Sequence, residues 1–123
     1  MATLTLTTIN LDSPDPGALA RFYAELLGWP VIAEEPDWVL LRPESGGTGL
    51  SFQREPNFIR PVWPASADDQ QMMIHLEIGV DELEPAVAHA IKCGATLADF
   101  QPQDDVRVCL DPAGHPFCLW LQE

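Results

Sequence analysis

A histidine and a glutamate, His75 and Glu77, lie two residues apart in a segment where apolar and polar residues alternate. An imidazole and a carboxylate are side chains that proteins use to transfer protons and to bind metal ions. Successive residues of a strand point to opposite faces of a sheet, so the apolar set from Ile74 to Val80 lies on one face. The sequence therefore predicts a sheet face that carries a His–x–Glu pair.

Two cysteines, Cys109 and Cys118, lie on either side of the last turn of the chain. A two-residue turn at Ala113–Gly114 would place the two side chains directly opposite each other in a hairpin. Two packed small side chains are one interpretation of this pair, and a reactive thiol is the other.

The elements that must position the His–x–Glu pair are a strand, a helix and a short second strand between residues 72 and 97. Asp81 is expected to end the first strand and to cap the helix, and Gly94 is expected to end the helix. The helix has an apolar stripe at helical spacing, formed by Leu83, Val87 and Ile91.

The first half of the chain repeats this order of elements. A strand is predicted at Ala2–Leu11 and a helix that ends at Gly28, with a loop at Asp12–Pro16 between them. Further strands are predicted at 29–33, 38–41, 50–54, 106–110 and 116–121. The chain is therefore expected to be a single α+β domain of two βαβββ modules, about 1–55 and 72–123, joined by a proline-rich linker at about 56–71.

The composition excludes several classes of partner. A net charge of −13 argues against nucleic acid and against an anionic membrane surface. No run approaches the ~18 apolar residues of a membrane span. Met1–Ile9 has neither a basic flank nor a small-residue cleavage site, so a cytoplasmic protein with reduced cysteines is expected.

Three segments resemble the vicinal oxygen chelate superfamily, which contains glyoxalases, bleomycin-resistance proteins and dioxygenases. They are DSPDPGALARFYAELLGW from Asp12, HLEIGVDELEPAVAHAIKCGA from His75 and DPAGHPFCLW from Asp111. The last two most resemble a bacterial glyoxalase-like domain branch. The resemblance implies two βαβββ modules whose sheets curl into open cups, often completed where modules of two chains meet.

Strand parity predicts which side chains line the cups. His75 and Glu77 are expected there from the fifth strand, and Cys118 and Trp120 from the last. The remaining expected lining residues are Trp38, Leu40, Ser51, Gln53, Arg107 and Cys109.

The resemblance also implies where a metal would be held. Metal-using members place a ligand on the first, fourth, fifth and eighth strands, usually His or Glu. His75 aligns with the fifth-strand histidine, but Ser51 and Cys118 stand at carboxylate positions, and Ala2–Ile9 offers no His, Asp, Glu or Cys. No conventional metal site and no cofactor are therefore expected, and the weak alternative is a divalent metal on His75, Glu77 and Cys118, with Gln53 as a weak fourth ligand.

Two functions follow from this reading. The first is a protein that sequesters a small aromatic or cationic molecule without catalysis, as a two-fold homodimer. The alternative is a glyoxalase-like lyase, isomerase or dioxygenase that uses an improvised metal site, or His75 and Glu77 as acid–base groups.

Overall fold

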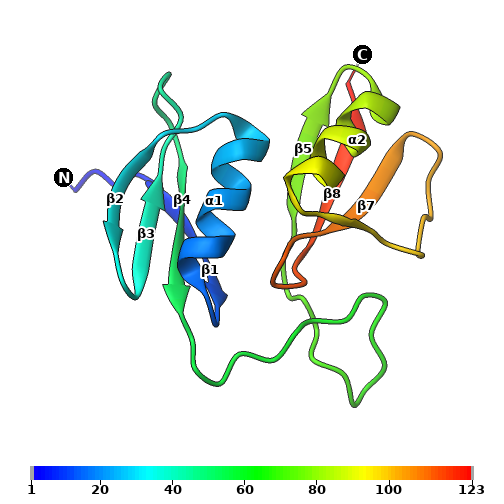
Figure 1. Ribbon diagram of the computed structural model, residues 1–123, viewed down its shortest axis with the longest axis horizontal. Helices are drawn as coiled ribbons and strands as arrows, with labels where there is room; N and C mark the ends of the chain where they lie inside the picture. The colour runs from blue at the N-terminus through cyan, green and yellow to red at the C-terminus, as the bar shows by residue number, and fades with distance from the viewer. Residues whose placement is uncertain (1, 123) are drawn as a thin grey trace. The chain divides into compact units, whose positions relative to one another are not determined.

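The computed structural model describes residues 2–122, and the chain divides into two compact units, Met1–Phe58 and Ile59–Glu123. Each unit contains one four-stranded mixed sheet and one helix that lies across a face of that sheet (Figure 1). The predicted architecture of two βαβββ modules is confirmed. No helix among the described residues is long and apolar enough to cross a membrane.

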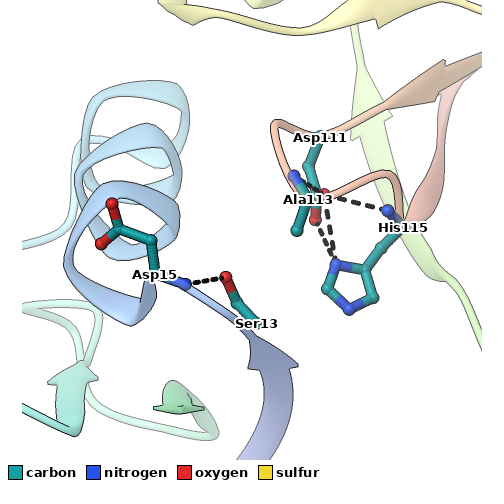
Figure 2. A network of polar contacts seen from close by, with 5 residues as sticks. All are labelled: Ser13, Asp15, Asp111, Ala113 and His115. Atoms are coloured by element: carbon teal, nitrogen blue, oxygen red, sulfur yellow. Dashed lines mark hydrogen bonds and ion pairs between the residues drawn. The ribbon is translucent and has the colours of Figure 1, made fainter. Parts of the chain in front are cut away.

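The first unit has the strand order β1-β4-β3-β2, with β1 parallel to β4 and the other neighbours antiparallel. Its elements are β1 (Thr8–Ser13), α1 (Pro16–Leu27), β2 (Val31–Glu35), β3 (Trp38–Leu41) and β4 (Gly49–Arg54). The first strand begins and ends later than the sequence predicts, so Asp12 and Ser13 belong to β1 rather than to a loop. The Ser13 hydroxyl accepts a hydrogen bond from the Asp15 backbone N–H at 3.0 Å, which turns the chain into α1 (Figure 2).

Helix α1 forms because both of its ends are capped. The Asp15 carboxylate accepts the Ala18 backbone N–H at 3.1 Å, and Gly28 ends the helix with a left-handed φ of 70°, as predicted. The buried face of α1 packs on its sheet, where the rings of Tyr23 and Phe52 stack at a centroid distance of 5.7 Å. Phe52 therefore points toward α1, and this fixes which face of the first sheet the helix covers.

The second unit has the strand order β5-β8-β7-β6, with β5 parallel to β8. Its elements are β5 (Leu76–Val80), α2 (Leu83–Cys93), β6 (Thr96–Leu97), β7 (Val106–Leu110) and β8 (Pro116–Leu121). The predicted cap of α2 is wrong by one residue, because Glu82 rather than Asp81 is the N-cap and its side chain makes no capping bond. Gly94 ends α2 with a φ of 126°, as predicted.

The loop between β7 and β8 is organised around Asp111, which is buried. One oxygen of its carboxylate accepts the backbone N–H groups of Ala113 and His115, and the His115 ring nitrogen Nδ1 lies 2.9 Å from the other (Figure 2). The last paired residues are Leu110 and Pro116, so the loop between them has five residues. The predicted opposition of Cys109 and Cys118 is therefore wrong, because Cys109 pairs with Phe117 and Cys118 pairs with Val108.

Candidate functional site

The register of the second sheet decides which side chains share a face. Glu77 pairs with Cys118 across the parallel ladder, and Gly79 pairs with Trp120. Residues opposite each other in a ladder point to the same side of the sheet, so Glu77, Cys118 and Trp120 lie on one face. Strand residues of the opposite parity, such as Arg107, lie on the face that α2 covers. We call the face with Glu77 the second cup face.

Three side chains gather on the second cup face. The Nε2 atom of His75 lies 2.5 Å from an Oε2 oxygen of Glu77, and the ligand atoms of His75, Glu77 and Cys118 all lie within 4.8 Å of one another. Cys118 is 3 % exposed, whereas the Glu77 side chain is 52 % exposed. This short contact between the imidazole and the carboxylate sets the orientation of the His75 ring.

The Cys118 thiol is held in its neutral form. Its pKa is raised to about 12, first by burial and then by the charge of Glu77, a hydrogen bond to Glu77 and the charge of Cys109. Because the thiolate is the nucleophilic form of cysteine, Cys118 is not an activated nucleophile in this arrangement. Burial likewise raises the pKa of Cys109 to about 11, so the reactive-thiol interpretation finds no support at either residue.

An aromatic residue outside the predicted site completes the cluster. The ring of Trp63 stacks on the ring of His75 with a centroid distance of 4.9 Å and an interplanar angle of 28°. Phe100 meets Trp63 edge to face at 5.3 Å. Sequence reasoning placed Trp63 in an extended linker, and the one signal available was a large aromatic residue in an otherwise polar, proline-rich segment.

The first sheet presents a second set of predicted residues. Trp38 pairs with Gln53 and Leu40 pairs with Ser51, and these residues alternate with Phe52, which faces α1. The four residues therefore lie on the face away from α1, as predicted, and we call this the first cup face. Whether they bind a ligand stays a prediction.

Two polar residues of the first cup face were missed by sequence reasoning. The Ser51 hydroxyl donates a hydrogen bond to the Oδ1 oxygen of Asn10 at 2.9 Å, and the Asn10 amide nitrogen donates to Asp12 at 2.8 Å. The alternation of Thr8, Asn10 and Asp12 with apolar neighbours was the signal that could have placed them on a strand face.

The predicted cup-facing orientation of Arg107 and Cys109 is wrong. Arg107 pairs with Leu119 and Cys109 pairs with Phe117, which places both on the face that α2 covers. The five-residue loop shifts the hairpin by one residue relative to a two-residue turn, and a shift of one residue moves every side chain to the other face. Arg107 instead lines a hollow of about 330 Å³ beside α2 and donates to the Asp104 carbonyl at 2.9 Å.

The His75, Glu77 and Cys118 cluster has ligand types that suit zinc, and three protein ligands would leave one open coordination position. Zinc requires a thiolate and a histidine nitrogen that is not donating a hydrogen bond. In this structure Cys118 carries a raised pKa and His75 Nε2 is committed to Glu77. A metal would therefore have to displace the Cys118 proton and break the His75–Glu77 contact.

The comparisons with known proteins agree with this fold. The sequence profile of a family described as "Glyoxalase-like domain" matches residues 8–120. A search of curated proteins found no match to the sequence.

Solved structures of the same fold cover nearly the whole chain. A glyoxalase/bleomycin resistance protein/dioxygenase family enzyme from Burkholderia phytofirmans PsJN is 20% identical, with a TM-score of 0.69 over 94% of this chain and 97% of that chain. A glyoxalase-related enzyme from Fulvimarina pelagi is 21% identical, with a TM-score of 0.70 over 98% and 89% of the two chains. TnmS3, an antibiotic binding protein from Streptomyces sp. CB03234, is 18% identical, with a TM-score of 0.64 over 100% and 99%.

Proposed function

Because the chain belongs to the family of glyoxalase-like domains, we propose that it binds a small aromatic or cationic molecule on its second cup face without a conventional metal site. The observation that carries the proposal is the pairing of an aromatic surface with a carboxylate there. Trp120 is 38 % exposed and pairs with Gly79 of β5. Glu77 lies two residues before Gly79 on the same face of the sheet, and its side chain is 52 % exposed. An exposed indole beside a carboxylate suits a flat or positively charged ligand.

Three further facts support this proposal. Cys118, the most buried member of the cluster, is held as a neutral thiol and so offers no nucleophile. The net charge of −13 attracts cations over a distance. TnmS3, which shares the fold, is an antibiotic binding protein, which supports a small-molecule ligand for a chain of this fold.

The test is calorimetric titration with the planar aromatic cations proflavine and ethidium. Trp120→Ala should weaken binding roughly tenfold, because stacking on an indole adds ~0.5–1.5 kcal/mol to the apolar area that it buries. Glu77→Gln should weaken the same cations, with an effect that falls as salt is added. The proposal fails if neither cation binds, or if both bind the Trp120→Ala protein as tightly as wild type.

A second candidate function rests on the ligand cluster. His75, Glu77 and Cys118 would hold a divalent metal, which supplies a Lewis acid to polarise a substrate oxygen in a lyase, isomerase or dioxygenase reaction. The contact between His75 and Glu77 would also suit acid–base work by these two residues. Elemental analysis of protein dialysed against zinc tests the metal-dependent form of this alternative, which requires bound zinc that is lost in both His75→Ala and Cys118→Ser.

The proposed assembly is a two-fold homodimer. Each sheet is open, so β1 and β2 in the first unit and β5 and β6 in the second present edges with unpaired backbone groups. Burial of such edges against a second copy is a common solution. A monomer by light scattering at micromolar concentration would contradict this assembly.

A further inference from the structure

We infer that Trp63 and His75 are the two walls of a sandwich site into which a flat, positively charged aromatic ring inserts. The inference rests on the proposed function and names a stacking residue and a ligand class for it. Trp63 lies in a connecting segment, Ile59–Gln71, which we call the strap. The site lies within the second unit, because the strap, His75 and Phe100 all belong to it.

The two rings already have the geometry of a stack. Their planes lie within 28° of parallel and their centroids are 4.9 Å apart. A ring inserted between them needs a separation of about 3.5–4.0 Å from each wall, the optimum for contacts between carbon atoms. Insertion therefore requires one wall to move by roughly the thickness of one aromatic ring.

His75 is the fixed wall. It directly precedes β5, and its Nε2 atom lies 2.5 Å from the Glu77 carboxylate. Glu77 is held in turn by its place in the β5–β8 ladder, where it pairs with Cys118. The imidazole thus has a set orientation, which lowers the entropic cost of stacking a ligand on it.

Trp63 is the movable wall. Hydrogen bonds of the strap close on the strap itself: the Val62 backbone N–H donates to the Gln70 carbonyl at 2.8 Å, and the Ser66 backbone N–H donates to the Asp69 carboxylate at 3.0 Å. The Arg60 side chain packs against Gly114 in the loop between β7 and β8, so this end of the strap is held to the sheet. Insertion of a ligand therefore moves the Trp63 side chain away from His75 while the strap keeps its place.

The surroundings define the ligand class. Phe100 packs edge to face against Trp63 at an interplanar angle of 71°, so the Trp63 ring lies among aromatic side chains. The Glu77 carboxylate contacts the His75 imidazole, and the Glu77 side chain is half-exposed. Its negative charge therefore favours a cation. A planar aromatic cation matches both the walls and the charge.

The experiment uses proflavine as the planar cation and anthraquinone-2-sulfonate as a planar anion. Their affinities for the full-length wild type, Trp63→Ala and Trp63→Phe are measured by calorimetry, with Trp29→Phe in the first unit as the matched control. Trp63→Ala should weaken proflavine roughly tenfold or more, and Trp63→Phe should retain most of the affinity because it keeps an aromatic face. Proflavine should bind wild type more tightly than the anion does.

Proton NMR of the His75 ring provides a readout that does not depend on the alanine variant folding well. Proflavine stacked on the imidazole should move the His75 ring-proton signals upfield in both wild type and Trp63→Phe, with His89 and His115 as internal references. Unmoved His75 signals under saturating proflavine would overturn the sandwich.

The remaining outcomes separate this inference from the proposed function. If Trp63→Ala binds proflavine as tightly as wild type while Trp120→Ala binds weakly, the second cup face is a binding site but the sandwich is wrong. Tighter binding to Trp63→Ala would make Trp63 a competitor for the His75 face and would also overturn the sandwich. If proflavine and ethidium both fail to bind wild type, the proposed function itself fails.

Discussion

The two units carry different polar side chains at equivalent positions of their parallel strand pairs. Asn10 and Ser51 pair between β1 and β4, and Glu77 and Cys118 pair between β5 and β8. The first pair is neutral, with the Ser51 hydroxyl donating to Asn10 at 2.9 Å. The second pair joins a carboxylate to a thiol with a strongly raised pKa. The repeated fold fixes where two polar side chains meet, and the residue types alone decide whether that position can carry charge.

The helices of the two units differ as well. Helix α1 buries five residues against its sheet: Pro16, Leu19, Ala20, Phe22 and Tyr23. Among the described residues of α2, Ala90 alone is buried, and Ile91 is 48 % exposed beside the hollow of about 330 Å³. The first unit is therefore the better packed of the two, while the ionisable cluster lies in the less tightly packed unit.

The largest expected effect tests this difference in packing. Leu19→Ala in α1, where Leu19 is 1 % exposed, should lower the free energy of unfolding by about 2–5 kcal/mol, because it leaves a cavity in a packed core. The matched change Leu83→Ala in α2 should cost about 1 kcal/mol or less, since Leu83 already lines a hollow. Urea unfolding followed by circular dichroism measures both, and equal losses would contradict the comparison.

The next prediction converts the second polar pair toward the neutral chemistry of the first. Glu77→Gln removes the charge that helps to raise the pKa of Cys118, so the thiolate fraction at pH 8.5 should rise about tenfold for each unit by which the pKa falls. Alkylation of Cys118 by iodoacetamide, followed by mass spectrometry, should accelerate accordingly. Cys109, on the opposite face, serves as the internal control, and an unchanged Cys118 rate would show that burial alone sets its pKa.

A further prediction concerns stability at alkaline pH. The pKa of Cys118 is raised in the folded protein from 9.0 to about 12, so the unfolded chain loses this proton first as the pH rises. The stability that the thiol contributes is full below pH 9 and is lost between pH 9 and about 12, by up to roughly 1.4 kcal/mol per pH unit.

Cys118→Ser tests this pH dependence because it places the first unit's residue, serine, at the second unit's position. The serine hydroxyl does not titrate in this range, so the decline in the unfolding midpoint from pH 9 to 11 should be shallower than in wild type. Equal slopes for the two proteins would mean that Cys118 does not contribute to the alkaline decline.

The smallest expected effect concerns metal. We expect protein purified without added metal to carry no stoichiometric Zn, Ni, Fe or Mn, because Ala2–Ile9 offers no His, Asp, Glu or Cys, and Ser51 and Cys118 stand where the resemblance expects carboxylate ligands. His75→Ala should then leave the metal content unchanged by elemental analysis. Stoichiometric metal in wild type that disappears in His75→Ala would contradict this expectation and would show that the second unit holds a metal centre.

The sequence by itself determined the repeated βαβββ order, the glycine ends of both helices and the faces of most cup residues. These features follow from local rules: apolar residues recur every second position in a strand, and glycine adopts a positive φ at low cost. For this reason Ser51, Gln53 and the Glu77–Cys118 pair could be assigned to the faces away from the helices before any coordinates were known.

Only the tertiary structure decided the features that depend on register and distant contacts. The buried Asp111 holds a five-residue loop, and its odd length turns Arg107 and Cys109 to the face of α2. The contact of Trp63 with His75 joins residues twelve positions apart through a segment without a strand or helix pattern. The pKa of Cys118 depends on how deeply β8 is buried and on which residue of β5 pairs with it, and no local pattern specifies either.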